Sequence, residues 1–173
     1  TTLPGFKGYE VYGNDFPIGF SFKYGGKLYD KFAISSNGFM ALGQGSTNLT
    51  TSANVNNLRD GLSTNRPIIA PFWDDLNMTD GLVSYKTEGI VGDRILTVEW
   101  SNANWSIRYD LSFQVKLYET SGKIEFIYRR EAVYNLIIDL LDASIGITDE
   151  NTGIRNFLSL QNVTSSPFVS SVV

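Results

Sequence analysis

The stretch "DLSFQVKLYETSGKIEFIYRR" at residues 110–130 decides the fold class. Its two halves alternate between apolar and polar side chains, which is the pattern of half-buried antiparallel strands. The "ETSGK" between the halves contains Gly122 and is typical of a tight turn. The stretch therefore predicts a β-hairpin. The apolar positions that carry the alternation are Leu111, Phe113, Val115, Leu117, Ile124, Phe126 and Tyr128.

The same period of two recurs on both sides of this hairpin. The pattern predicts about nine to eleven strands, and we expect an all-β fold, an antiparallel two-sheet β-sandwich of jelly-roll type in one domain over residues 1–173. The tight-turn signal Ser36-Asn37-Gly38 should join two short strands. The other expected strands cover residues 16–24, 31–43 (in two parts), 66–77, 82–89, 93–100, 143–148 and 156–160.

Two stretches break the strand pattern. Residues 44–65 are polar and rich in Asn, so we expect them to be a functional loop or to be partly helical near residues 53–61. Residues 131–143, "EAVYNLIIDLLDA", carry apolar side chains at mixed spacing and could form one or two helical turns. The sequence shows no internal repeat and no linker.

The segment "RPIIAPFWDDLN" (66–77) could be a catalytic strand with two carboxylates or a buried strand that ends in charge. Neighbouring side chains of an extended strand point to opposite faces, so Asp74 and Asp75 cannot both face one reacting atom. Alternation would place Trp73 on one face with Ile69 and Pro71, and Phe72 on the other with Ile68 and Ala70. Both faces are apolar, which favours a strand buried on two sides with Trp73 in the core.

The missing residue types exclude several chemistries. The 173 residues contain no Cys and no His, so thiolate nucleophiles, disulfides, zinc–thiolate sites and imidazole bases are all impossible. A metal site could use only oxygen ligands, which suits calcium or magnesium. We expect no required cofactor and no enzymatic activity, with calcium as a possible ion.

The charge and hydropathy of the sequence limit the kinds of partner that it can bind. The net charge is −4 and the only adjacent basic pair is Arg129-Arg130, so we expect no binding to nucleic acid. No apolar run reaches the ~20 residues of a membrane span. Because the chain begins with Thr1, we expect it to be a mature product or a domain excised from a larger multidomain protein, and we favour the excised domain.

Two groups of side chains are candidate sites. The segment "SNANWSIRY" (101–109) lies between two predicted strands, so we expect a loop whose aromatics could stack on a sugar while amides bind its hydroxyls. Trp100 itself should belong to the core. The candidate ligand-binding residues are Trp105, Asn102, Asn104 and Tyr109. The candidate calcium ligands are Asp74, Asp75, Asn77 and Asp80. The "TDENTG" at 148–153 also places oxygen ligands at alternate positions, but a plain turn is the favoured interpretation.

The order of these pieces resembles the extracellular nidogen-like domain over roughly residues 15–160. It is most similar to related β-sandwich modules in secreted, multidomain surface proteins of gliding-type bacteria. The most specific segments are the Asn-Gly turn with its following small-residue strand, "APFWDD", and the hairpin of residues 110–130. The resemblance implies a non-catalytic adhesion or accessory module, and the missing Cys favours a bacterial version.

We therefore expect an extracellular or cell-surface module that contacts a glycan or protein surface and the neighbouring domains of its own chain. The alternative is a carbohydrate-binding module attached to a polysaccharide-degrading enzyme. An exposed aromatic platform would favour this second function.

Overall fold

Eleven strands build the part of the chain that the computed structural model describes, namely residues 1, 6–43, 56–62, 64–105, 109–129 and 143–161. No helix occurs among these residues, and hence none that could cross a membrane. The strands are β1 (Tyr12–Tyr24), β2 (Lys27–Ser35), β3 (Phe39–Leu42), β4 (Ile68–Trp73), β5 (Leu76–Asn77), β6 (Leu82–Glu88), β7 (Ile95–Trp105), β8 (Tyr109–Tyr118), β9 (Ile124–Tyr128), β10 (Ser144–Thr148) and β11 (Phe157–Gln161).

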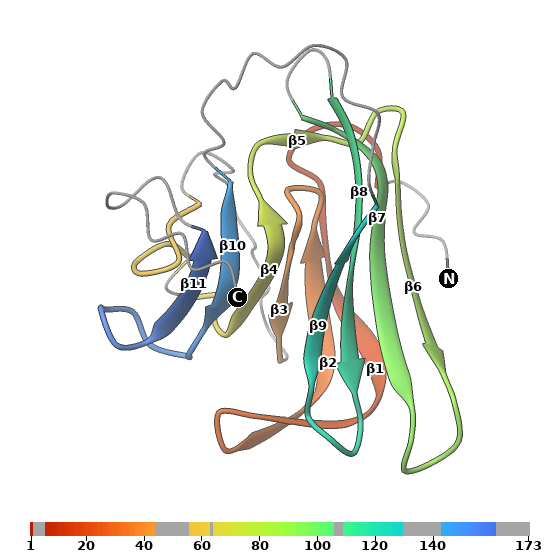
Figure 1. Cartoon of the computed structure of the whole chain (residues 1–173), viewed down its shortest axis with the longest axis vertical. Coiled ribbons are helices and arrows are strands. Elements are labelled where there is room, and N and C mark those ends of the chain that lie inside the picture. Colours follow the sequence, from red (N-terminus) through yellow and green to blue (C-terminus); the bar gives the residue numbers. More distant parts are fainter. Residues whose placement is uncertain (2–5, 44–55, 63, 106–108, 130–142, 162–173) are drawn as a thin grey trace.

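The strands form two antiparallel sheets that face one another (Figure 1). One sheet has six strands in the order β1-β2-β3-β4-β10-β11, and the other has five, in the order β5-β7-β8-β9 with β6 also paired to β7. Most neighbours are consecutive in the chain. A jelly roll would have several connections that pass from one sheet to the other. Here the chain builds the second sheet with β5–β9 and then returns to the first sheet, where β10 pairs with β4. The predicted all-β sandwich is confirmed.

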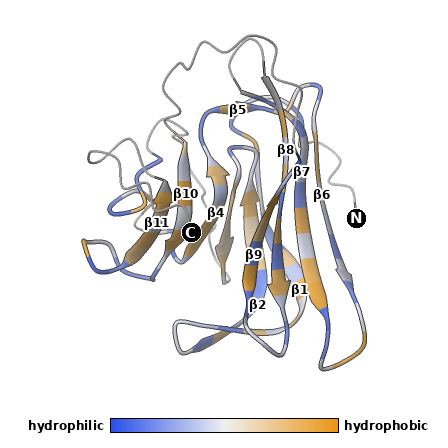
Figure 2. Cartoon of the chain, viewed as in Figure 1, coloured by the Kyte–Doolittle hydropathy of each residue, from blue (hydrophilic) through white to orange (hydrophobic). Residues whose placement is uncertain are grey.

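The main core fills the space between the sheets. The predicted hairpin of residues 110–130 is β8 and β9, and it pairs Phe113 with Tyr128 and Val115 with Phe126. Trp100 is fully buried, stacks on Phe113 at 5.3 Å between ring centroids, and donates its Nε1–H to the Ser35 carbonyl at 2.8 Å. The expectation that Trp100 belongs to the core is confirmed. Figure 2 shows the hydrophobic colouring concentrated in bands along the strands.

Strand β4 is buried on both faces, as its sequence predicts, but its alternation breaks before Trp73. The β4–β10 ladder pairs Ala70 with Gly146 and Trp73 with Ser144, so β4 carries one extra residue there. As a result Phe72 faces the main core and contacts Phe113, while Trp73 faces the outer side of the sheet. The predicted grouping of Trp73 with Ile69 and Pro71, and of Phe72 with Ile68 and Ala70, is therefore wrong at this end of the strand.

A second, smaller core lies on the outer face of the six-stranded sheet. Trp73 is fully buried there and packs on Phe39 at 4.7 Å between ring centroids. Leu58, also fully buried, comes from the segment 56–62, and Leu62 of the same segment packs against this core. The Arg66 guanidinium holds the segment by donating to the Leu58 carbonyl at 2.7 Å and to the Gly61 carbonyl at 2.9 Å. The helix expected near residues 53–61 is replaced by turns over residues 58–62, while residues 44–55 and 130–142 lie outside the described ones.

The Asn37-Gly38 turn, predicted from its sequence, is seated against the end of β4. The Phe72 N–H donates to the Gly38 carbonyl at 3.3 Å, and the Asp74 N–H donates to the Asn37 carbonyl at 3.2 Å. The Asn37 side-chain oxygen accepts the Leu76 N–H at 3.3 Å. Gly38 has φ +78°, and a Cβ there would lie 1.9 Å from the Phe72 carbonyl oxygen. Only glycine fits, for both conformational and steric reasons.

An ion pair with added backbone hydrogen bonds lies at the end of the second sheet that carries the β6–β7 turn. The Arg94 guanidinium and the Glu119 carboxylate form an ion pair, with Nη2 and Oε1 2.6 Å apart. Glu119 Oε2 also accepts the Gly92 N–H at 2.9 Å. These hydrogen bonds, chiefly those from Arg94, lower the pKa of Glu119 to about 2. The β6–β7 turn is thereby fixed to the end of β8.

Gly38→Ala should prevent folding or lower the melting temperature by many degrees. The positive φ alone costs a non-glycine residue about 1–3 kcal/mol, and the contact with the Phe72 carbonyl adds a backbone clash. Gly26→Ala is the matched control, because Gly26 has φ +82° but nothing within 4 Å of the added Cβ. Thermal melting of both variants checks this. Equal losses of melting temperature at the two positions would show that the contact between the turn and β4 does not contribute to stability.

Acid should destabilise the fold in the window between the pKa of a glutamate in the unfolded chain and that of Glu119. A carboxylate whose pKa is lowered in the folded state adds stability above its unfolded value, near 4.5, and loses it as the pH falls toward about 2. Glu119→Gln should flatten the fall of melting temperature in this window, and Arg94→Gln should act in the same direction. An unchanged pH profile in both variants would contradict the assignment.

Candidate functional site

The expected sugar-binding loop at residues 101–109 is mostly strand. Residues 101–105 continue β7, and β8 begins at Tyr109, so only residues 106–108 remain between the strands. The backbone of Trp105 pairs with Tyr109 of β8 on one side and with Leu76 of β5 on the other. The expectation of an open loop is therefore wrong for residues 101–105. The side chains of Trp105 and Tyr109 lie outside the described ones.

The two candidate amides of this group occupy different settings. Asn102 is exposed at a bulge in β7, with φ +53°, and its side-chain oxygen accepts a hydrogen bond from Arg129 Nη2 at 3.0 Å. Asn104 is half-buried and its backbone pairs with that of Asn77. The fold thus brings a candidate ligand-binding residue beside a candidate calcium ligand, which the sequence did not indicate.

The polar side chains of "APFWDDLN" lie in different settings: some accept hydrogen bonds from neighbouring groups of the chain, and others are exposed. Asp74 is 7% exposed, and its Oδ1 accepts the N–H of Asp75 at 2.7 Å, while the side chain of Asp75 is exposed. The Asn77 side-chain oxygen accepts both the N–H and the hydroxyl of Thr79, at 2.8 and 2.6 Å. Asp80 is exposed. Among the described residues, no three acidic side chains gather closely enough to hold a metal ion.

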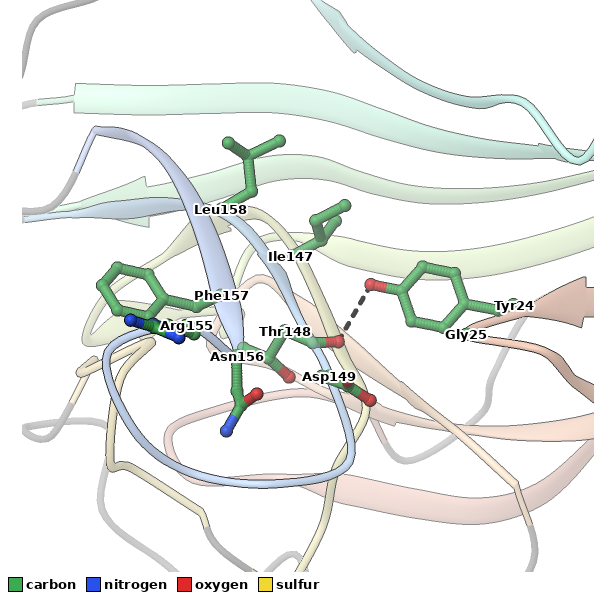
Figure 3. A pocket seen from close by; sticks show the side chains of 9 residues that line it. All are labelled: Tyr24, Gly25, Ile147, Thr148, Asp149, Arg155, Asn156, Phe157 and Leu158. Atoms are coloured by element: carbon green, nitrogen blue, oxygen red, sulfur yellow. Dashed lines mark hydrogen bonds between the residues drawn. The ribbon is translucent and has the colours of Figure 1, made fainter.

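Sequence reasoning missed a pocket at one end of the six-stranded sheet. It is shallow and open, with a volume of about 280 Å³, and it lies where the end of β1 meets the β10–β11 hairpin (Figure 3). Its lining combines aromatic and aliphatic side chains with an acid, a base and an amide. The lining residues are Tyr24, Gly25, Ile147, Thr148, Asp149, Arg155, Asn156, Phe157 and Leu158.

Two tyrosines fix the β1–β2 turn to the β10–β11 hairpin at this pocket. The Tyr24 hydroxyl donates to the Thr148 carbonyl at 2.9 Å, and burial together with the nearby Asp149 raises its pKa to about 12. The Tyr29 hydroxyl donates to Glu150 at 2.7 Å, and Glu150 also pairs with Lys27 at 2.6 Å. The hydrogen bonds from Lys27 and Tyr29 lower the pKa of Glu150, so this network is charged and intact at neutral pH.

The remaining polar groups of the pocket are open to a ligand. Arg155 is exposed, and its guanidinium has no hydrogen bond or ion pair to any described residue. Asp149 uses Oδ1 to accept the Glu150 N–H at 2.6 Å, which leaves Oδ2 available. Asn156 donates its amide to the Thr152 carbonyl at 2.6 Å and keeps its side-chain oxygen. Thr148 ends β10 and residues 149–153 belong to the connection to β11, in which the turn itself falls at residues 154–155. No local motif marks the pocket, because Tyr24 comes from the other end of the chain.

Comparison with known proteins identifies the family of the chain. No curated protein and no solved structure matches the chain. A family model described as "NIDO related" matches residues 1–173, which is the whole sequence. Domains of this family are typically extracellular. The strand order and the seated Asn-Gly turn are thus the fold of a nidogen-related module, and the chain belongs to the NIDO-related family.

Proposed function

We propose that the chain is a non-catalytic extracellular module that makes adhesive or accessory contacts for a larger bacterial surface or secreted protein. The observation that carries this proposal is the use of the family's most specific segments. The Asn37-Gly38 turn and the end of β4 are hydrogen-bonded to one another, and the Asp74 carboxylate accepts the Asp75 N–H, so these segments define the scaffold. A domain whose specific residues build its core works through its surfaces.

The placement of the acids supports the absence of catalysis. Glycoside hydrolysis needs two carboxyl groups that face each other across a substrate. Asp74 is buried beneath the β4–β5 corner and bonded to the backbone of Asp75, whose own carboxylate faces solvent. We propose no required cofactor. A calcium ion on Asp74, Asp75, Asn77 and Asp80 would have to displace Thr79 from the Asn77 side-chain oxygen.

A carbohydrate-binding module attached to a polysaccharide-degrading enzyme is the alternative, and the pocket at Tyr24 favours it. A pyranose ring presents an apolar face and hydroxyl groups that both donate and accept hydrogen bonds. Ile147 and Leu158 offer an apolar wall, while Asp149 and Arg155 offer an acceptor and a donor whose charges offset each other. Such a pocket suits a neutral polyol better than a strongly charged ligand.

We expect no turnover on a broad panel of glycan and ester substrates, because Asp74 is buried and bonded to the backbone and so cannot act as a partner for the exposed carboxylate of Asp75. Product formation followed by chromatography is the measurement. Turnover that is lost in Asp75→Asn, an exposed position where folding should persist, would overturn the non-catalytic function. Asp74→Asn is a weaker test, because its side chain is buried and its loss could unfold the chain.

If the carbohydrate alternative holds, the wild type should be retarded on polysaccharide affinity gels and Arg155→Ala should not. Arg155 is exposed and unpaired among the described residues, so its loss should leave the melting temperature unchanged. Asp149→Asn keeps the Oδ1 that accepts the Glu150 N–H and tests the carboxylate separately. Trp105→Ala in the same assay tests the site predicted from the sequence. A wild type that no polysaccharide retards would contradict the alternative and leave the adhesion or accessory function.

A further inference from the structure

The connection between β10 and β11, residues 149–156, carries three of the polar side chains that line the pocket (Figure 3). These are the side chains of Asp149, Arg155 and Asn156. We call residues 149–156 the strap. The apolar wall of the pocket stands on β10 and β11, and Tyr24 comes from β1. The position of the strap therefore decides whether the pocket can offer charged and amide groups to a ligand.

The strap has no buried side chain to anchor it. Each of its residues is half-buried or exposed, and Ile154, its one large apolar side chain, is 78% exposed. The strands at its two ends are held more firmly. Thr148 is buried and its hydroxyl oxygen accepts the Ile68 N–H at 2.8 Å, while Phe157 packs against the second core. Because segments with few buried apolar contacts open at the lowest free energy, we expect the strap to open before the strands.

Polar contacts attach the strap to two other parts of the chain. Toward the β1–β2 turn, Glu150 pairs with Lys27 at 2.6 Å and accepts the Tyr29 hydroxyl at 2.7 Å. Toward the segment of the second core, the Gly153 N–H donates to the Arg59 carbonyl at 2.9 Å. The side chain of Lys27 is 62% exposed and that of Glu150 is 35% exposed, so water competes for their ion pair. The attachment to the β1–β2 turn is therefore weak.

Hydrogen bonds inside the strap join its residues into one unit. The Asp149 N–H donates to the Asn156 carbonyl at 2.7 Å, and the Asn156 N–H donates to the Gly153 carbonyl at 3.1 Å. The Asn156 side-chain amide donates to the Thr152 carbonyl at 2.6 Å. The Glu150 N–H donates to Asp149 Oδ1 at 2.6 Å. Since Glu150 and Gly153 belong to the same bonded loop, loosening one attachment should loosen the other.

We infer that the strap opens and closes as one unit over the pocket, and that Glu150 positions its closed form. In the closed form the strap presents its carboxylate, guanidinium and amide to a ligand. In the open form the apolar wall and Tyr24 are left without these groups. A polyol that binds the closed form alone therefore holds the strap shut. As a control on binding, the inference rests on the carbohydrate alternative proposed above, whereas the motion itself does not.

Residue-resolved amide hydrogen exchange of the whole chain at neutral pH, without ligand, tests the motion. The strap amides should share one opening constant and exchange faster than the Ile68 amide in β4. The strap amides that donate backbone hydrogen bonds are those of Asp149, Gly153 and Asn156.

Glu150→Gln removes the charge that pairs with Lys27 and keeps an oxygen that accepts the Tyr29 hydroxyl. This variant should speed the exchange of all three strap amides by the same factor, roughly two- to fivefold, because the strap opens as one unit. Glu88→Gln is the matched control. Glu88 pairs with Lys86 on β6, outside the strap, so its loss should leave the three strap amides unchanged. The melting temperature should fall by no more than a few degrees in either variant.

A soluble polysaccharide that retards the wild type on a gel should slow the exchange of all three strap amides, because it binds the closed form. If no polysaccharide retards the wild type, the carbohydrate alternative fails, and exchange without ligand still decides the motion. The inference would be overturned if Glu150→Gln changed the exchange of Asp149 alone or of none of the three amides. It would also be overturned if Glu88→Gln sped the three strap amides as much as Glu150→Gln does.

Discussion

The seat of the Asn37-Gly38 turn against the end of β4 is the constraint on which the rest of the sandwich depends. Three backbone or side-chain acceptors of the turn take the N–H groups of Phe72, Asp74 and Leu76, so the turn orders the chain as it leaves one sheet for the other. Ser35, the last residue of β2 ahead of the turn, accepts a hydrogen bond at its carbonyl from Trp100 of the opposite sheet. One tight turn therefore joins both sheets, and it can do so only because Gly38 carries no side chain.

The sequence predicts the strands well because a two-residue period is a local property. The hairpin of β8 and β9, the short strands around Asn37, and the two buried faces of β4 all follow from side-chain alternation. The face of Trp73 could not be predicted, because the extra residue in β4 is fixed by pairing with Ser144 and Gly146, far along the chain. The extension of β7 to Trp105 depends in the same way on pairing with β5.

The candidate sites were harder to predict than the fold because they join distant segments. The polar, aromatic stretch at residues 101–109 has the composition of a binding loop, yet strand pairing takes up most of its backbone. The pocket beside Tyr24 combines the end of β1 with the β10–β11 hairpin, and each segment alone has the composition of an ordinary turn. Composition indicates which chemistry is possible, while topology decides which groups meet.

The different widths of the two sheets explain why the free groups gather around β10 and β11. Since β5 and β6 share one side of β7, the second sheet is four strands wide, whereas the first is six. In Figure 1, β10 and β11 extend beyond β9. The Tyr128 hydroxyl, bonded to the Pro71 carbonyl at 2.6 Å, marks where β9 contacts the wider sheet. Past that boundary Ile147 is only half-buried and Leu158 is mostly exposed, although both continue the core-facing side of the sheet. The contact of the Asn37-Gly38 turn with β4 stabilises the fold. The exposed groups lie around β10 and β11, where they can change without disturbing the core.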